Sequence, residues 1–161
     1  MLDEFKELLS VFNAHSVKYL VVGAYAVSAH AQPRATKDLD IWVKPDAENA
    51  KAVYAALAQF GAPLEGLTSA DFADRGPFFH MGREPLAVDI LTEIPGVEFD
   101  EAWERRVEDV IDDTTGLKAS LIYRTDLITA KLAAARPQDL ADVDAIRKAE
   151  KAQSQSKKGP E

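Results

Sequence analysis

Residues 38–43, Asp-Leu-Asp-Ile-Trp-Val, constrain the fold more than any other segment of the chain. The apolar residues predict a strand that enters the core, and Pro45 closes it. Residues two apart in a strand point to the same face, so Asp38 and Asp40 are expected to lie side by side. Two carboxylates at that spacing resist ionising together unless a cation sits between them. Mg²⁺ prefers such oxygens, so the pair indicates a metal site, although solvated acidic pairs at strand ends give the same pattern.

The pattern of the whole chain predicts an α/β (α+β) fold. Helical spacing and short apolar runs alternate in the first half, and strand patterns pair locally in the second half. Helices are expected at 2–15, 24–31, 46–61, 100–106, 126–135 and 138–152, with one helical turn at 69–74. Strands are expected at 19–22, 38–43, 77–82, 86–92, 107–111 and 117–123. We expect a single domain over residues 1–150, a mixed sheet with helices packed around it, and a disordered tail at 151–161.

Composition excludes several classes of protein. The 161 residues include no cysteine, which excludes disulfides and thiolate metal sites. The net charge of −8 argues against an extended nucleic-acid-binding face, because such a face needs clustered Lys and Arg. No apolar run approaches the ~20 residues of a membrane span, and the acidic N-terminus is unlike a signal peptide. A cytoplasmic protein with no membrane partner is therefore expected.

A third carboxylate lies inside a later apolar segment. Asp89 is flanked by the apolar residues of 86–91, where a lone charge would be costly to bury. If its strand lies beside residues 38–43, three carboxylates converge, as a two-metal site for phosphoryl chemistry requires. The alternative is that Asp89 faces solvent from a half-exposed strand.

A glycine between a strand and a helix precedes the aspartates. Gly23 follows the apolar run 19–22 and begins an Ala-rich helical segment. Free backbone N–H groups at such a point can meet a phosphate, and glycine allows a ligand to come close. A single glycine between a strand and a helix more often serves only to form a turn. Its position shortly before Asp38 and Asp40 favours the phosphate-binding interpretation.

These residues resemble the minimal nucleotidyltransferases of the DNA polymerase beta superfamily. That family has Gly-Gly or Gly-Ser at the start of a helix, then a D-x-D strand, then a third carboxylate, and the matching segments are "LVVGAYAVSAHAQPRATKDLDIWV" and "AVDIL". The form is most similar to the branch of AbiEii-type toxins and MNT-like relatives. The C-terminal motif of that branch matches "KLAAARPQDLADV" through Lys131, Arg136, Asp139 and Asp142. The resemblance spans about residues 17–147.

The resemblance implies a nucleotidyltransferase-like fold and transfer of a nucleoside monophosphate from a nucleoside triphosphate (NTP) to an acceptor, with two Mg²⁺ ions. Asp38 and Asp40 would hold both ions, and Asp89 would hold the catalytic ion and help activate the acceptor oxygen. Gly23 and the helix after it would face the triphosphate. Ala24 stands where the family has its second Gly or Ser; the hydroxyl is lost but the backbone N–H remains.

Several further residues are candidates for the site. Arg34 and Lys37 flank the D-x-D and could bind phosphate oxygens, or could only neutralise nearby aspartates. Lys131, in an apolar helical segment, is a candidate phosphate contact. Thr36 is expected to hold its loop through a backbone hydrogen bond.

A second group of residues is weighed less heavily. Asp139 and Asp142 share one helical face near a helix start, and in the resemblance they lie near the active site. Asp139 could instead serve only the helix dipole. His80 alternates with Phe79 and Met81 and is interpreted as a strand residue.

Three functions are weighed. The first is an Mg²⁺-dependent nucleotidyltransferase acting on an RNA, protein or small-molecule acceptor. One form of this hypothesis is a toxin that modifies tRNA or protein and has a cognate antitoxin. The second is a catalytically inactive relative that binds nucleotide or acts as a scaffold, which Ala24 favours. The third is a D-x-D glycosyltransferase, disfavoured because the chain is short and Gly23 and Asp89 would then be coincidences.

Overall fold

The computed structural model describes residues 1–32, 36–76, 78–82 and 87–157. Within these ranges the helices are α1 (Asp3–Ala14), α2 (Gly23–His30), α3 (Ala47–Phe60), α4 (Phe99–Glu104), α5 (Arg124–Ala134) and α6 (Pro137–Lys157), with a 3₁₀ turn η1 (Ser69–Phe72). The strands are β1 (Tyr19–Val22), β2 (Asp38–Val43), β3 (Phe78–Met81), β4 (Ala87–Leu91), β5 (Val107–Asp112) and β6 (Leu117–Leu121).

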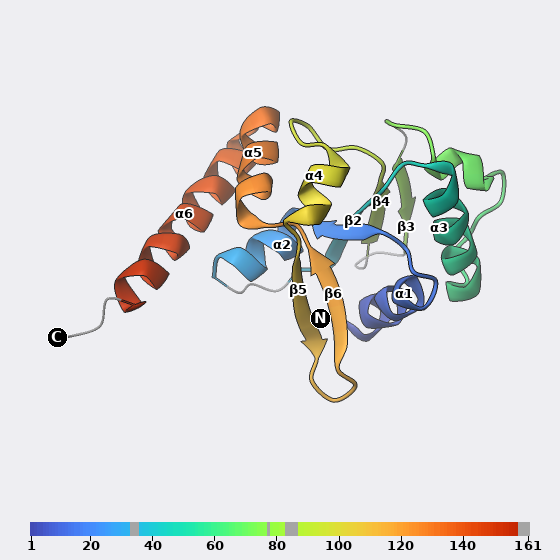
Figure 1. The fold of residues 1–161 in the computed structure, drawn as a ribbon, viewed down its shortest axis with the longest axis horizontal. Coiled ribbons are helices and arrows are strands. Elements are labelled where there is room, and N and C mark those ends of the chain that lie inside the picture. Colours follow the sequence, from blue (N-terminus) through green and yellow to red (C-terminus); the bar gives the residue numbers. More distant parts are fainter. Residues whose placement is uncertain (33–35, 77, 83–86, 158–161) are drawn as a thin grey trace.

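The strands form one six-stranded mixed sheet in the order β3-β4-β2-β1-β6-β5. β2 pairs antiparallel with β1 and parallel with β4, and β1 pairs parallel with β6. The outer pairs, β3 with β4 and β5 with β6, are antiparallel. Figure 1 shows the helices distributed around this sheet. The predicted α/β fold of a mixed sheet surrounded by helices is therefore confirmed.

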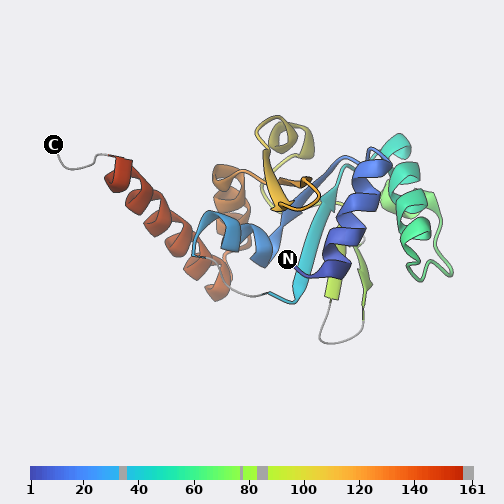
Figure 2. The same cartoon turned by 90° about the horizontal axis from the view of Figure 1, so that it is seen from below.

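Alternation along the strands gives the sheet two buried faces. Leu39, Ile41 and Val43 of β2 pack in a core with α1 and α3. Trp42, which points the other way, packs in a second core with residues of α2, α4 and α5. Figure 2 shows α1 and α2 on opposite sides of β2. Asp38 and Asp40 lie four and two residues before Trp42 in β2, so their side chains point to the same face as Trp42, the α2 side of the sheet.

The ends of α3 follow their predicted signals. Asp46 caps the N-terminus, its carboxylate accepting a hydrogen bond from the Asn49 N–H at 2.7 Å. Gly61 ends the helix in the left-handed conformation, with φ of 95°. These caps fix the short connection between β2 and the helix that covers its apolar side.

One boundary differs from the sequence prediction. The disordered tail was expected from residue 151, whereas α6 continues to Lys157 and projects from the rest of the molecule at its C-terminal end (Figures 1 and 2). Ala, Gln and Lys are good helix formers, and no breaker occurs before Gly159, so the helix propagates beyond its last buried residue. Residues 158–161, like residues 83–85 of the predicted turn between β3 and β4, lie outside the described ranges. No helix in the described part of the chain is both long and apolar enough to span a membrane.

Candidate active site

The three predicted carboxylates share one face of the sheet. In the parallel pairing of β2 with β4, Asp40 lies directly opposite Asp89, and Asp38 lies opposite Ala87. Strand partners in register point to the same face, so Asp89 joins the two aspartates of β2 on the α2 side. Asp38 is exposed, and Asp40 and Asp89 are half-buried. The condition set by the sequence, that the strand of Asp89 lies beside that of Asp38 and Asp40, is met.

The carboxyl groups are close enough to perturb one another. Burial, the negative charge of Asp89, a hydrogen bond with the Asp89 carboxyl group and the charge of Asp38 together raise the pKa of Asp40 from 3.8 to about 6, burial contributing most. The charge of Lys131 acts in the opposite direction. A hydrogen bond between two carboxyl groups needs a proton on one of them, and the raised pKa makes Asp40 its carrier. Such crowding of like charges is typical of a site that binds a cation.

Gly23 holds the backbone of α2 against Asp40. Val22 pairs with Asp40 across β1 and β2, so the next residue begins α2 directly beside that carboxylate. Gly23 has φ of +67°, and a Cβ on it would collide with Oδ2 of Asp40. Both the conformation and the space therefore require glycine. The N-cap residue of α2 is Val22, which makes no side-chain capping hydrogen bond, so the helix begins with its first N–H groups beside the Asp40 carboxylate.

His80 joins the site from the edge strand. It lies opposite Asp89 in the antiparallel pairing of β3 with β4, and its Nδ1 is 2.5 Å from Oδ1 of Asp89. The sequence alone indicates His80 only as a strand residue. Its alternation with Phe79 and Met81 does place it on the polar face, but the pairing with Asp89 depends on the register between the two strands.

Lys131 is held by two buried acids of the next helix. Its Nζ lies 3.2 Å from Oδ1 of Asp139 and 2.9 Å from Oδ2 of Asp142. The two carboxylate side chains are only 2% and 6% exposed. Arg136 also donates to Asp139, from Nε at 2.7 Å, and the pKa of Asp139 is lowered chiefly by this hydrogen bond. Asp139 is therefore more than a partner of the helix dipole: it fixes α5 to α6 and orients Lys131.

The remaining predicted residues lie at the entrance to β2. Oγ1 of Thr36 accepts a hydrogen bond from the Asp38 N–H at 3.2 Å, as expected for a residue that holds the loop. Lys37 is exposed, and its carbonyl accepts from the Ala87 N–H, but no described contact brings its ammonium to the carboxylates. Arg34 lies outside the described residues.

The donor set is compatible with Mg²⁺. Among the described residues, no group of three or more His, Cys, Asp or Glu side chains is arranged to hold a metal ion. Mg²⁺ is nevertheless commonly bound by one or two carboxylates, with water and substrate phosphates completing its coordination. Asp40 and Asp89 supply two neighbouring carboxyl groups, paired across β2 and β4. Asp40 and Asp89, with Asp38 on the same face, would hold such an ion only together with phosphate and water oxygens.

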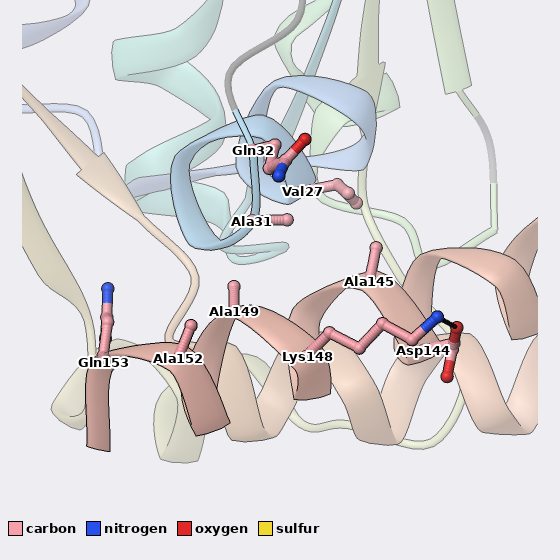
Figure 3. Close-up of a pocket in the computed structure, with 9 residues that line it drawn as sticks. All are labelled: Val27, Ala31, Gln32, Asp144, Ala145, Lys148, Ala149, Ala152 and Gln153. Atoms are coloured by element: carbon pink, nitrogen blue, oxygen red, sulfur yellow. Dashed lines mark ion pairs between the residues drawn. The ribbon is translucent and has the colours of Figure 1, made fainter. Parts of the chain in front are cut away.

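A separate cavity lies away from this cluster. It has a volume of about 640 Å³ and lies between α2 and α6, lined by Val27, Ala31, Gln32, Asp144, Ala145, Lys148, Ala149, Ala152 and Gln153 (Figure 3). None of these is a predicted site residue. The chemistry of the carboxylates, rather than the size of a cavity, therefore identifies the candidate active site.

Solved structures with the same fold were found by comparison. One is a lincosamide antibiotic adenylyltransferase, LnuA, in its lincomycin-bound form, with a TM-score of 0.56 and 15% identity over 91% of this chain and 96% of that one. Another is the antibiotic-resistance factor ANT(2'')-Ia, with a TM-score of 0.56 and 13% identity over 93% of this chain and 82% of that one. A search of curated proteins gave no significant match.

These similarities establish the fold, and the sequence of the chain establishes the family. The match to a family model extends over residues 1–151, which include every candidate residue of the site. The chain belongs to the family described as "Nucleotidyltransferase of unknown function (DUF6036)".

Proposed function

We propose that the protein is an Mg²⁺-dependent transferase that moves a nucleoside monophosphate from an NTP to the hydroxyl group of a small-molecule acceptor. The observation that carries this proposal is the placement of three carboxylates on one face of the sheet, with Asp40 opposite Asp89. Burial and the neighbouring carboxylates raise the pKa of Asp40 to about 6. Like-charged groups held this close favour a divalent cation. Membership of a nucleotidyltransferase family supports the same chemistry.

The carboxylates have distinct roles in the proposed reaction. Asp38 and Asp40 would hold the metal ions together with Asp89, and the carboxylate of Asp89 would also accept the proton of the acceptor hydroxyl. The acceptor oxygen attacks the α-phosphorus, the bond from that phosphorus to the bridging oxygen breaks, and pyrophosphate leaves with the bonding electrons. When bound, Mg²⁺ supplies the positive charge that offsets the phosphate and carboxylate charges. Catalysis then depends mainly on positioning and charge neutralisation.

The triphosphate has a candidate place beside Asp40. The backbone N–H groups of Gly23 and Ala24 at the uncapped start of α2 can donate to phosphate oxygens. Lys131 adds a positive charge, which lowers the pKa of Asp40. Because Asp139 and Asp142 restrain its ammonium, Lys131 acts at a fixed position. Arg34 and Lys37 complete the proposed set of phosphate-binding residues.

The acceptor is proposed to be a small molecule with a hydroxyl group. The net charge of −8 disfavours an extended polynucleotide partner. The names of the two similar structures, a lincosamide adenylyltransferase in its lincomycin-bound form and an antibiotic-resistance factor, suggest the same acceptor class. A tRNA or protein acceptor, with a cognate antitoxin, is the alternative that belongs to the AbiEii- and MNT-like branch.

The proposal is tested by label transfer. The protein is incubated with Mg²⁺ and each α-³²P-labelled NTP, together with separate panels of hydroxylated amines, tRNA and proteins. We expect transfer to small molecules by the wild type and none by Asp40→Ala. Asp113→Ala, which removes an exposed carboxylate in the turn between β5 and β6, is the matched control and should retain transfer. Labelling of tRNA or protein alone would replace the small-molecule acceptor with the toxin-like alternative.

An inactive relative would behave differently. A protein that kept the fold but lost turnover would bind an NTP with Mg²⁺, measured by calorimetry, and transfer no label to any panel. Absence of both metal and nucleotide binding in the wild type would contradict the enzyme and the nucleotide-binding scaffold together. This absence of binding can be measured without knowing the acceptor, so it tests both hypotheses directly.

A further inference from the structure

The most informative contact outside the three aspartates is that between His80 and Asp89. His80 lies on the edge strand β3, opposite Asp89 on β4, so its side chain stands on the carboxylate face. Its Nδ1 is 2.5 Å from Oδ1 of Asp89. An imidazole N–H donates to a carboxylate oxygen, so this contact places the proton on Nδ1. Asp89 is thereby contacted from both neighbouring strands, by His80 on β3 and by Asp40 on β2.

The contact contributes little to stability. The side chains of His80 and Asp89 are 54% and 32% exposed, and an exposed ion pair contributes about 0–1 kcal/mol to folding. Removing His80 should therefore leave the fold intact. It would, however, free one oxygen of Asp89 and allow the carboxylate to turn away from Asp40. The orientation of Asp89, rather than the stability of the sheet, is what His80 controls.

We propose that His80 is a positioning residue, which holds the carboxylate of Asp89 through Nδ1–H in the orientation that metal binding and acceptor activation require. This inference rests on the proposed function, because it assigns a role toward Asp89 as a metal ligand. Hydrogen-bond partners of metal ligands commonly affect metal affinity or activity by about 10- to 100-fold. His80 provides such a partner from a strand that carries no other predicted site residue.

The geometry allows a specific test by substitution. The side-chain amide of Asn places an N–H donor near the position of Nδ1, whereas that of Gln places its donor near Nε2. A role through Nδ1 is therefore restored by His80→Asn and not by His80→Gln. His15→Ala is the matched control, because His15 also makes an exposed side-chain hydrogen bond, with Gln59 at 2.6 Å, but lies in α1's C-terminal turn outside the site.

The experiment measures Mn²⁺ affinity by calorimetry in the presence of a non-hydrolysable ATP analogue, with label transfer as a second readout. We expect His80→Ala and His80→Gln to weaken Mn²⁺ binding by about 10- to 100-fold and to lower kcat with little change in KM. His80→Asn should restore most of both values, and circular dichroism should show all variants folded. His15→Ala should match the wild type.

Each alternative result has a definite meaning. Wild-type Mn²⁺ affinity in His80→Ala overturns the positioning role while the proposed function stands. Equal impairment of the Ala, Asn and Gln variants also overturns it, because the effect would then not pass through Nδ1. Absence of Mn²⁺ binding in the wild type contradicts the proposed function, and with it this inference, and is recognised without any variant.

Discussion

Asp40 on β2 and Asp89 on β4 lie opposite each other in a parallel strand pair, and their carboxyl groups share a hydrogen bond. Two residues separated by a long stretch of sequence thus form one acidic unit beside the start of α2. Burial and the neighbouring negative charges raise the pKa of Asp40 to about 6. Near neutral pH and without a cation, the two carboxylates repel each other. This repulsion should affect how the stability of the protein depends on pH and on Mg²⁺.

The stability of the metal-free protein should depend on pH through Asp40. Its pKa is about 6 in the folded protein against 3.8 in the reference state, so the folded state binds more protons between these values. The free energy of unfolding therefore falls as pH rises from about 4 to 6, by on the order of 2 kcal/mol from this group. Urea unfolding at several pH values should show this slope in the wild type and its loss in Asp40→Asn. Parallel pH profiles for the two proteins would contradict the coupling.

Mg²⁺ should stabilise the wild type more at pH 7.5 than at pH 5, because a cation and a proton compete for the same carboxyl groups. The measurement is the change in Tm on adding Mg²⁺ with a non-hydrolysable NTP. Asp40→Asn should show little metal-dependent shift at either pH. An equal shift in wild type and Asp40→Asn would place the metal elsewhere.

Gly23→Ala should abolish activity and destabilise the fold. The new Cβ would collide with Oδ2 of Asp40, and the residue would keep a positive φ. Gly116→Ala is a matched control, because Gly116 has φ of +73° and no atom lies within 4 Å of the position that its Cβ would take. The control should cost roughly 1–2 kcal/mol from backbone strain alone and retain full kcat. Denaturant unfolding and label transfer compare the two variants, and equal effects would remove the special role of Gly23.

Asp139→Asn should destabilise the protein by about 3 kcal/mol, because it leaves the buried ammonium of Lys131 with one fewer charged partner. The pKa of Asp139 is lowered, so its stabilisation is present above about pH 4 and lost as pH falls further. Asp144→Asn is the control on the same helix: its pair with Lys148 is 65% and 77% exposed, and the expected cost is below about 0.5 kcal/mol. Both variants are compared by urea unfolding at pH 7. A similar decrease in the free energy of unfolding in both would show that burying Lys131 with Asp139 and Asp142 does not contribute to stability.

Ala24→Ser should lower the KM for the NTP by about 3- to 10-fold, the effect of one added hydrogen bond of about 1 kcal/mol. The hydroxyl would lie at the uncapped start of α2, beside Gly23. Ala29→Ser, at an exposed position nearer the end of the same helix, should leave KM unchanged. An unchanged KM in Ala24→Ser would mean that the backbone N–H groups alone are sufficient there.

Local features of the sequence predict most of the helices and strands and supply the candidate residues of the site. Two-residue alternation in 38–43 predicts that Asp38 and Asp40 share a face, and capping signals at Asp46 and Gly61 predict the bounds of α3. A glycine between strand and helix marks the start of α2. Each of these signals depends on backbone conformation within a few residues, and so it can be read without knowing the rest of the fold.

The long-range relationships were decided only by the tertiary structure. Strand order and register place Asp89 opposite Asp40 and His80 opposite Asp89, and packing of α5 against α6 encloses Lys131 between Asp139 and Asp142. A register shift of one residue would send Asp89 or His80 to the opposite face. Register is set by how the apolar sides of all strands fit the core beneath α1 and α3, a collective property of packing. The sequence alone determined which residues could carry the chemistry, and the packed sheet decided which of them meet.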